Sequence, residues 1–425
     1  MKMALKQLMA ATGLAMMLAA CGGGGEENGT TETQVTEADM PETDENGFII
    51  DPEFQAGLQE QLLDAQPGDV IEIPAGKYSL TRSLSLTGNG VTIRGAGMDA
   101  TILSFANQTS GAEGLTVTGD DFTIEDIAIE DPKGDAIKIN GTKNVVIRRV
   151  RTEWTGEPSE ENGAYGLYPV QVTNVLIEDS VARGASDAGI YVGQSDNVIV
   201  RNNLAEANVA GIEIENTNDA DVYGNRATNN TGGILVFNMP NLPRPGSRTR
   251  VYDNDVVSNN HANFAAAGTA VSSVPPGSGV IINSNDYVEI FDNRIADNNT
   301  GNVIISSFYS TGFQTDRGIA DAYDPFPENI LVTGNEFSGG GTAPAKAYAE
   351  LKTAYGGDLP AVIWDGYVNP EVDDPQICVS NGDAQLLNID RENGFANMAI
   401  VEMDDCVPDE RLKEITLPDT MMGRP

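Results

Sequence analysis

The sequence predicts an all-β fold, a single-stranded right-handed parallel β-helix of about nine coils with a helical cap at its N-terminal end. Short β-type runs at residues 190–192, 212–214 and 234–236 begin 22 residues apart. Each run follows a turn of small residues that includes glycine. One coil of this length cannot bury its own apolar face, so successive coils must stack on one another.

A helix is predicted to cover the open end of the first coil. The stretch 51–63 places Phe54, Leu58, Leu62 and Leu63 at helical spacing, which gives an apolar stripe. Uncovered edge strands would pair with other chains, so a cap is expected at this end.

Side chains are predicted to alternate between the inside and the outside of each coil. Ile212 and Ile214 point inward, whereas Glu213 and Glu215 point outward. A second β-type run follows the first, and a corner rich in Asn and Asp, residues that tolerate left-handed backbone, then turns the chain.

Asparagines recur with the period of the coil. Asn203 and Asn225 are 22 residues apart, as are Asn208 and Asn230. Stacked asparagines of this kind can form internal amide ladders, so we interpret them as structural rather than catalytic.

The chain divides into four predicted parts. Residues 1–20 resemble a lipoprotein signal peptide, because two lysines and an apolar run precede the lipobox that ends at Cys21. Cys21 is therefore the expected lipidation site, and residues 21–47, which are rich in Gly, Glu and Thr, form a flexible tether. The β-helix is assigned to 48–341, with coils from about 68, and a C-terminal appendage to 342–425.

Cysteine and charge composition limit the compartment and the partners. With Cys21 lipidated, Cys378 and Cys406 remain to form a disulfide in an exported protein. The formal net charge of −38 argues against nucleic acid and anionic lipid as partners, so membrane contact is expected only through the lipid anchor. A single histidine, His261, leaves no His or Cys cluster for a metal. We expect a monomer at the cell envelope, anchored to the outer membrane.

Two insertions, at about 152–166 and 238–279, are expected to wall a ligand groove, since extra length in a solenoid goes into loops on the working side. Between them the outward side chains of the first strand mix a cation, aromatic rings and carboxylates. Lys138, Tyr191 and Glu213 are the candidate catalytic residues. The candidate substrate-binding residues are Trp154, Tyr165, Tyr168, Asp187, Glu215 and Phe237.

These residue types suit sugar chemistry. Aromatic faces stack on sugar rings, and carboxylates bind hydroxyl groups or Ca²⁺. A Lys138 or Tyr191 base beside a neutralised uronate would support β-elimination or epimerisation. Paired carboxylates would instead support hydrolysis. If the site uses Ca²⁺, the candidate ligands are Asp187, Glu213 and Glu215.

The stretch from about 51 to 335 resembles a family of exported bacterial proteins with parallel β-helix repeats in the pectate-lyase-like superfamily. The residues that carry the resemblance are 92–95, 111–115, 162–170, 184–195 and 210–216. It implies the fold and export, and no particular activity.

More distantly, the fold resembles pectate lyases, polygalacturonases, mannuronan epimerases and the periplasmic NosD-type proteins of copper-site maturation. The segment Asp131-Pro132-Lys133 has lysine where the Asp-Pro-His motif of the epimerases has histidine.

Two functional hypotheses follow. The first is a lipid-anchored protein that binds a polysaccharide and cleaves or epimerises it, as a lyase or epimerase before a hydrolase. The alternative is a non-catalytic exported scaffold that binds a partner protein during assembly, in a NosD-like role. Fold alone does not decide between them, since one fold hosts many functions.

Overall fold

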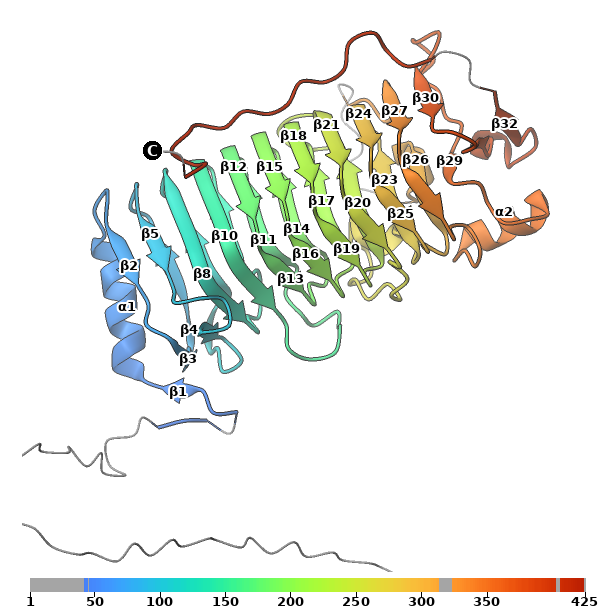
Figure 1. Ribbon diagram of the computed structural model, residues 1–425. Coiled ribbons are helices and arrows are strands. Elements are labelled where there is room, and N and C mark those ends of the chain that lie inside the picture. The colour runs from blue at the N-terminus through green and yellow to red at the C-terminus, as the bar shows by residue number, and fades with distance from the viewer. Residues whose placement is uncertain (1–41, 45, 313–322, 403–405, 424–425) are drawn as a thin grey trace, which may run out of the picture. The chain divides into compact units, whose positions relative to one another are not determined.

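The computed structural model describes residues 42–44, 46–312, 323–402 and 406–423 (Figure 1). The described residues all belong to one compact unit. The predicted signal peptide, Cys21 and most of the predicted tether lie outside the described residues. None of the helices in the described part of the chain has the length and apolar character that a bilayer-spanning helix needs.

The chain winds into a parallel β-helix whose coils contribute strands to three faces, and strands of successive coils pair in parallel.

Face I contains β2 (Val70–Glu72), β5 (Thr92–Arg94), β8 (Phe122–Glu130), β10 (Lys143–Glu153), β12 (Thr173–Glu178), β15 (Asp196–Arg201), β18 (Asn218–Tyr223), β21 (Ser247–Tyr252), β24 (Asp286–Phe291), β27 (Ile330–Thr333) and β30 (Ile377–Ser380). Face II contains β1 (Ile49–Ile50), β3 (Gly76–Ser79), β6 (Thr101–Ser104), β13 (Val181–Arg183), β16 (Leu204–Glu206), β19 (Arg226–Thr228), β22 (Asp255–Val257), β25 (Arg294–Ala296) and β28 (Glu336–Ser338), together with the second halves of β8 and β10.

Face III contains β4 (Arg82–Leu86), β7 (Ser110–Val117), β9 (Ile137–Asn140), β11 (Tyr165–Val170), β14 (Ala188–Gly193), β17 (Ala210–Glu215), β20 (Gly232–Phe237), β23 (Ser278–Asn283), β26 (Gly301–Ser306), β29 (Val362–Trp364), β31 (Leu386–Asn388) and the antiparallel β32 (Ala399–Val401).

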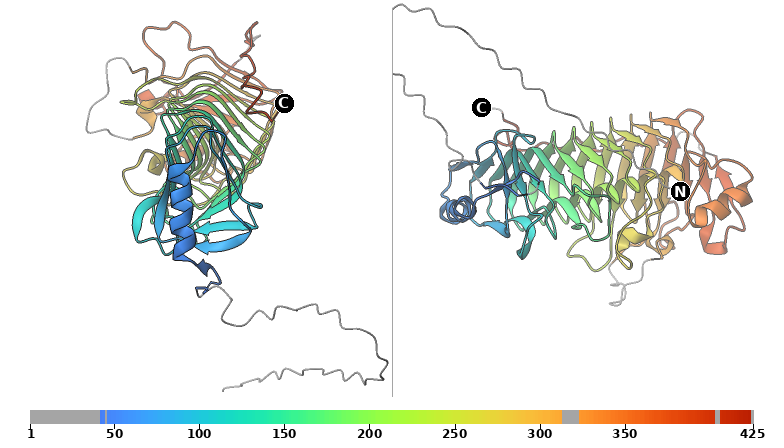
Figure 2. Two further views of the ribbon diagram at one scale, coloured as in Figure 1. Left: turned by 90° about the vertical axis from the view of Figure 1, so that its left-hand side faces the viewer. Right: turned by 90° about the horizontal axis from the view of Figure 1, so that it is seen from below.

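The predicted helical cap is confirmed as α1 (Pro52–Asp64), which lies across the first end of the coil stack (Figure 2). The Asp51 side chain accepts a hydrogen bond from the Phe54 amide at 2.9 Å and so caps the helix N-terminus. Leu58 and Leu62 are buried against the first coil, whereas Leu63 is 59% exposed.

Two asparagine ladders run through the coil corners, as the 22-residue spacing predicts. In one ladder the Asn203 amide donates to Asn225 at 2.9 Å, and the amide of Asn225 donates to Asn254 at 3.0 Å. In the other, Asn208 donates to Asn230 at 3.0 Å. Each amide nitrogen also donates to a backbone carbonyl, so buried polar groups at the corners are satisfied.

The β-helix is longer than predicted. In the part of the chain that the structure describes, face III has twelve strands, of which only β32 is antiparallel, so more coils stack than the nine or so predicted. The domain does not end at 341, since β29, β30 and β31 continue the parallel ladders. The prediction missed these coils because Val303 pairs with Val362, 59 residues later, and this interval includes the helix α2 (Ala347–Tyr355).

A C-terminal strap, defined here as residues 407–423, returns along the outside of face I (Figure 1). A disulfide between Cys378 on β30 and Cys406 fixes its first end. The Leu412 amide donates to Glu289 at 2.8 Å and the Ile415 amide donates to Asp221 at 3.0 Å. The strap thereby runs back along face I from β30 to β10, where the Arg148 guanidinium donates to the Met421 carbonyl at 3.0 Å.

Candidate functional site: a carboxyl and tyrosine cluster on face III

Outward side chains of face III form the predicted rows. Lys138 pairs in register with Tyr168, and Tyr191 pairs with Glu213, which pairs with Leu235. In the neighbouring row Gly193, Glu215, Phe237, Asn283 and Ser306 follow one another. The assignment of these side chains to the outside of one sheet is therefore confirmed.

The middle of these rows is not open to solvent. Tyr191 is 4% exposed, Glu213 2% and Phe237 5%. Insertions that follow β20 and β22 fold back over the sheet, so Val271 and Val274 pack in one apolar cluster with these rings. Tyr191 and Glu213, expected to face an open ligand groove, are instead covered, because alternation along a strand predicts direction but not what a distant loop covers.

Three tyrosines pack together where the rows emerge from this cover. The ring centroids of Tyr165 and Tyr168 are 4.4 Å apart, and those of Tyr165 and Tyr191 are 4.7 Å apart. The ammonium of Lys138 lies 5.1 Å from the Tyr168 ring centroid and 3.3 Å from an Asp135 oxygen. Tyr165, Tyr168 and Lys138 are partly exposed, so this end of the cluster is accessible.

Three carboxyl groups lie against the tyrosines. The Tyr191 hydroxyl donates to Glu215 Oε1 at 2.6 Å and accepts from the Gln194 amide at 3.0 Å. The Tyr165 hydroxyl donates to Asp187 Oδ2 at 3.3 Å. Asp187 Oδ1 and Glu213 Oε2 are buried and have no hydrogen-bond partner among the described residues. Buried polar oxygens without a partner are uncommon in native proteins and mark a place that a ligand can satisfy.

The carboxyl groups hold protons more tightly than usual. Burial, and then the charge of Glu215, raise the pKa of Asp187 to about 8. Burial raises the pKa of Glu215 to about 7, although its bond from Tyr191 lowers it. Burial and the charges of Asp187 and Glu215 raise the pKa of Glu213 well above its ordinary value. Near neutral pH the cluster therefore contains both protonated and ionised carboxyl groups.

The same surroundings disfavour a tyrosinate. Burial and nearby carboxylates raise the pKa of Tyr191 well above 10, and burial raises the pKa of Tyr168 to about 12. A neutral phenol donates a hydrogen bond or a proton more readily than it removes one. Of the residues in the cluster, Glu215 fits the role of base better than Tyr191 does.

Trp154 does not reach this site. It is 6% exposed and belongs to the main core, where its Nε1 donates to the Pro132 carbonyl at 2.8 Å. A Cβ atom on Gly163 would lie 2.5 Å from the Trp154 ring, so the two residues occupy one tight space between coils. The expected role of Trp154 in stacking on a ligand is wrong, because the 152–166 insertion packs this ring inward.

The described residues do not fit a preformed metal site. No three His, Cys, Asp or Glu side chains among them come together as metal ligands. At Asp187 and Glu215, tyrosine hydroxyls already occupy oxygens that Ca²⁺ would need. His261 places Nδ1 2.8 Å from the Ala262 carbonyl, and Cys378 is in the disulfide, so the nitrogen and sulfur ligands that copper prefers are also not assembled.

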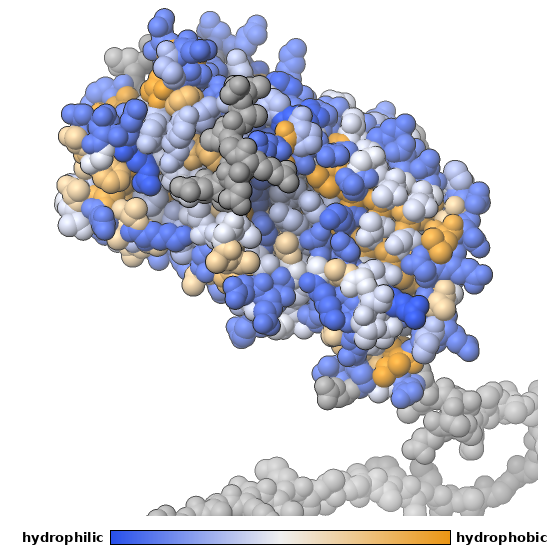
Figure 3. Space-filling view, turned by 180° about the vertical axis from the view of Figure 1, so that it is seen from behind, coloured by the Kyte–Doolittle hydropathy of each residue, from blue (hydrophilic) through white to orange (hydrophobic). Residues whose placement is uncertain are grey.

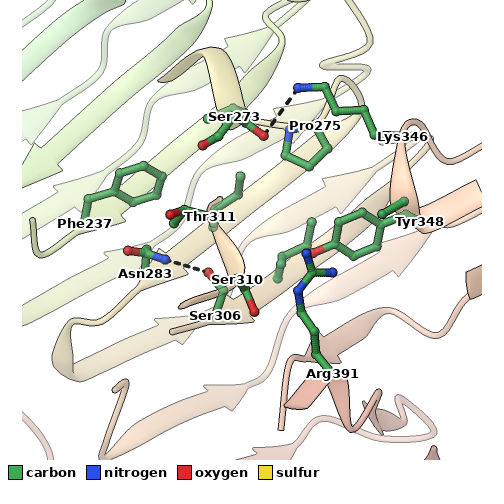
Figure 4. Close-up of a pocket in the computed structure, with 14 residues that line it drawn as sticks. Phe237, Ser273, Pro275, Asn283, Ser306, Ser310, Thr311, Lys346, Tyr348 and Arg391 are labelled. Atoms are coloured by element: carbon green, nitrogen blue, oxygen red, sulfur yellow. Dashed lines mark hydrogen bonds between the residues drawn. The ribbon is translucent and has the colours of Figure 1, made fainter. Parts of the chain in front are cut away.

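A pocket on face III lies beyond Phe237, further toward the C-terminus (Figure 4). It has a volume of about 240 Å³. Lys346, Tyr348 and Arg391 line its outer side. Sequence reasoning did not select them, because residues 342–425 were expected to lie outside the β-helix. The apolar run 362–364 was the available signal that another coil exists there.

Comparisons with known proteins agree on the architecture. The family model described as "Periplasmic copper-binding protein (NosD)" matches residues 75–274, 200 of the 425 residues. The A-module of mannuronan C-5 epimerase AlgE4 from Azotobacter vinelandii matches with a TM-score of 0.51 and 20% identity, over 74% of this chain and 86% of that one. The chain is a parallel β-helix repeat protein.

Other solved β-helix repeat proteins are more distant. The A-module of AlgE6 from Azotobacter vinelandii has 20% identity and a TM-score of 0.48, over 77% of this chain and 87% of that one. Comparison with curated protein sequences gives no significant match. At such identities the likeness concerns the fold, so function has to be argued from the site.

Proposed function

We propose that this β-helix repeat protein binds a polysaccharide along face III and acts on it at the carboxyl and tyrosine cluster. The observation that carries the proposal is the pair of buried oxygens without partners, Asp187 Oδ1 and Glu213 Oε2, beside three packed tyrosine rings. Sugars offer hydroxyl donors to such oxygens and CH faces to aromatic rings.

The chemistry supported best is proton transfer at a sugar carbon or a glycosidic oxygen. With a pKa of about 7, Glu215 can accept a proton near neutral pH, and Asp187, with a pKa of about 8, can donate one. The Tyr191 hydroxyl, 2.6 Å from Glu215, keeps that carboxyl oriented. Elimination or epimerisation needs the base, hydrolysis also needs the acid, and the cluster contains both.

The expected place of action is the cell envelope. The lipobox that ends at Cys21 supports export and lipid anchoring, and the matching family model is described as periplasmic. We further propose that the lipid anchor lies in the outer membrane and that the acidic tether acts as a spacer.

The test is a screen of the purified protein against acidic and neutral polysaccharides. Ultraviolet absorbance detects unsaturated products, reducing-end assays detect hydrolysis, and NMR detects epimers. Glu215→Gln should lower the turnover of any substrate found by at least about 100-fold, the lower range for loss of a general base. Glu336→Gln, an exposed change on face II, should leave turnover unchanged.

A non-catalytic scaffold is the second candidate. The observation that favours it is the match of residues 75–274 to a family model named for periplasmic copper binding, in a chain whose described residues assemble no metal ligands. If wild type binds a polysaccharide or a partner protein without turnover, and Glu215→Gln binds equally well, the result supports a scaffold and contradicts an enzyme.

A further inference from the structure

The pocket beyond Phe237 differs in charge from the rest of the molecule. The chain has 63 acidic and 25 basic residues, and from behind its surface is predominantly hydrophilic (Figure 3). None of the 14 described residues that line the pocket is Asp or Glu, whereas two of them, Lys346 and Arg391, are basic. A site with this composition favours a negative ligand even though the whole protein repels one.

Arg391 is the main cation of the pocket. Its side chain makes no hydrogen bond or ion pair with any residue that the structure describes, whereas most arginines of the coils are paired with carboxylates. Figure 4 shows its guanidinium group beside the ring of Tyr348. A guanidinium group can bind a carboxylate through two parallel hydrogen bonds, and here these donors are available.

Lys346 holds the opposite rim. Its ammonium group donates to the Ser272 carbonyl at 3.0 Å and to the Ser273 carbonyl at 3.5 Å. The second contact, drawn in Figure 4, also ties the loop before β23 to the start of α2. An ammonium group has three donors, so it can serve the loop and a ligand together.

Asp365, whose carboxylate binds the pocket residue Ser310, does not cancel these charges. Asp365 is 3% exposed and accepts hydrogen bonds from the Ser307 amide at 2.6 Å and the Ser310 hydroxyl at 2.6 Å. It therefore lies behind the pocket wall with its own donors. Burial also raises the pKa of Asp365, which favours its neutral form.

The remaining walls suit a sugar ring. Phe237 and Tyr348 are aromatic, and the Asn283 amide donates to the Ser306 hydroxyl at 3.0 Å across the floor. The volume of about 240 Å³ is below the roughly 300–1,000 Å³ of pockets for drug-sized ligands, which suits a single small unit.

The pocket lies on the same row of face III as part of the carboxyl and tyrosine cluster. Glu215, Phe237 and Asn283 are register partners on three consecutive strands. Parallel strands are about 4.8 Å apart, so about 10 Å separates the row position of Glu215 from that of Asn283. The two places are therefore close enough for one oligosaccharide to reach both, with the loops after β20 and β22 covering Phe237 between them.

We propose that the Lys346–Arg391 pocket is a subsite for the carboxylate of a uronic acid unit, so that the polysaccharide is an acidic one. This inference rests on the proposed function, since it names the substrate class of the same groove. Arg391 binds the carboxylate, Lys346 adds charge at the rim, and Tyr348 packs on the sugar ring.

The test compares acids with their own methyl esters. Calorimetry measures binding of galacturonate and mannuronate tetrasaccharides and of their methyl esters, which keep the sugar and remove the charge. Wild type should bind one acid at least about tenfold more tightly than its ester, as expected for a charged hydrogen bond. Arg391→Gln should abolish this preference and leave the affinity for the ester unchanged. Lys413→Gln, which removes an exposed lysine of the strap, should keep the preference.

The outcomes separate this inference from the proposed function. Equal affinity of wild type for acid and ester, or an unchanged preference in Arg391→Gln, overturns the uronate subsite. Binding of neutral polysaccharides alone overturns the subsite but leaves the proposed function standing. If no polysaccharide binds, both fail.

Discussion

Tyr191 points outward from its strand and is nevertheless buried, whereas alternation along a strand would predict that outward side chains are exposed. Its side chain points away from the outer surface of β14. Only 4% of it is exposed, because the ring packs under the loops that follow β20 and β22. Its hydroxyl donates to Glu215 at 2.6 Å. The residue therefore contributes to a second apolar cluster outside the main core as well as to the carboxyl site.

Tyr191→Ala should for this reason be strongly destabilising, by about 3–5 kcal/mol, the range for deletion of a buried aromatic ring. Tyr191→Phe keeps the ring and loses only the hydrogen bond, so about 1 kcal/mol is expected. Urea unfolding followed by circular dichroism measures both. A loss below about 1 kcal/mol for Tyr191→Ala would show that the loops do not cover the ring in solution.

Asp187 should make the protein less stable as pH rises. Its pKa is about 8 in the folded chain against an ordinary 3.8, so the folded state binds more protons between these values. The stabilising effect of this group is complete below about pH 4 and is lost as pH rises toward 8. Asp187→Asn removes the titration, so its free energy of unfolding relative to wild type should increase between pH 5 and 8 by about 2 kcal/mol or more.

Urea unfolding at pH 5, 6.5 and 8 measures this difference, and Asp64→Asn at the exposed end of α1 is the matched control. The free energy of unfolding of Asp64→Asn should differ from that of wild type by the same amount at every pH. Parallel curves for Asp187→Asn and wild type would contradict the proton-binding role of the cluster.

At the scale of single residues, the direction of a side chain could be predicted from the sequence, but its burial could not. The register of Lys138, Tyr168, Tyr191 and Glu213 follows from period-two alternation and equal coil lengths. Their burial depends on loops whose path no local pattern specifies. Arg391 could not be found at all, because its position depends on a coil that starts 59 residues after its neighbour.

At the scale of elements, the regular coils show why sequence reasoning succeeded. Each ladder asparagine has one structural task, so the 22-residue spacing in the sequence identifies stacked neighbours, such as Asn203 and Asn225, whose amide bond is 2.9 Å long. Asn254 continues this ladder 29 residues after Asn225, because the insertion after β20 lengthens that coil. The strap has no such period. Its position is set by single contacts, such as the Arg148 guanidinium donating to the Met421 carbonyl at 3.0 Å.

The strap should be a stabilising cover of face I rather than a part of the coil stack. Leu417 and Met421 are both 4% exposed and pack on Val146, Leu176 and Ile199, which point outward from the face. Deletion of residues 407–425 keeps Cys406 and its disulfide, so the β-helix should still fold. The uncovered apolar strip should bind a hydrophobic dye, and the melting temperature should fall.

Circular dichroism, dye fluorescence and thermal melting of this truncated chain measure the three effects. Leu417→Ala with Met421→Ala in the full chain is the milder variant and should lose about 2–5 kcal/mol per site. An unchanged melting temperature together with no dye binding would show that the strap does not rest on face I.

At the scale of the whole molecule, the charge and the site have opposite electrostatic characters. A formal net charge of −38 surrounds a pocket lined by Lys346 and Arg391. Acidic groups elsewhere repel a polyanion at long range, and only the local cations favour it at contact. Low salt should therefore slow the encounter with an acidic polysaccharide while strengthening the contact at Arg391.

The same charge predicts how the fold itself responds to ions. Folding brings the carboxylates closer together, and salt screens their repulsion, with a Debye length of about 30 Å at 0.01 M and about 10 Å at 0.1 M. The melting temperature should therefore rise by several degrees, about 2–4 °C per kcal/mol gained, when NaCl increases from 10 to 500 mM. Choline chloride should raise the melting temperature equally at equal ionic strength, since screening does not depend on the cation.

CaCl₂ at matched ionic strength should add no saturable rise in melting temperature at micromolar concentrations, because the described residues assemble no metal ligands and the tyrosines occupy oxygens of Asp187 and Glu215. A melting temperature that does not change with NaCl would contradict the repulsion. A saturable rise in melting temperature at micromolar Ca²⁺ would show that the carboxyl cluster rearranges to bind the ion, and Ca²⁺ would again be a candidate ligand of the site.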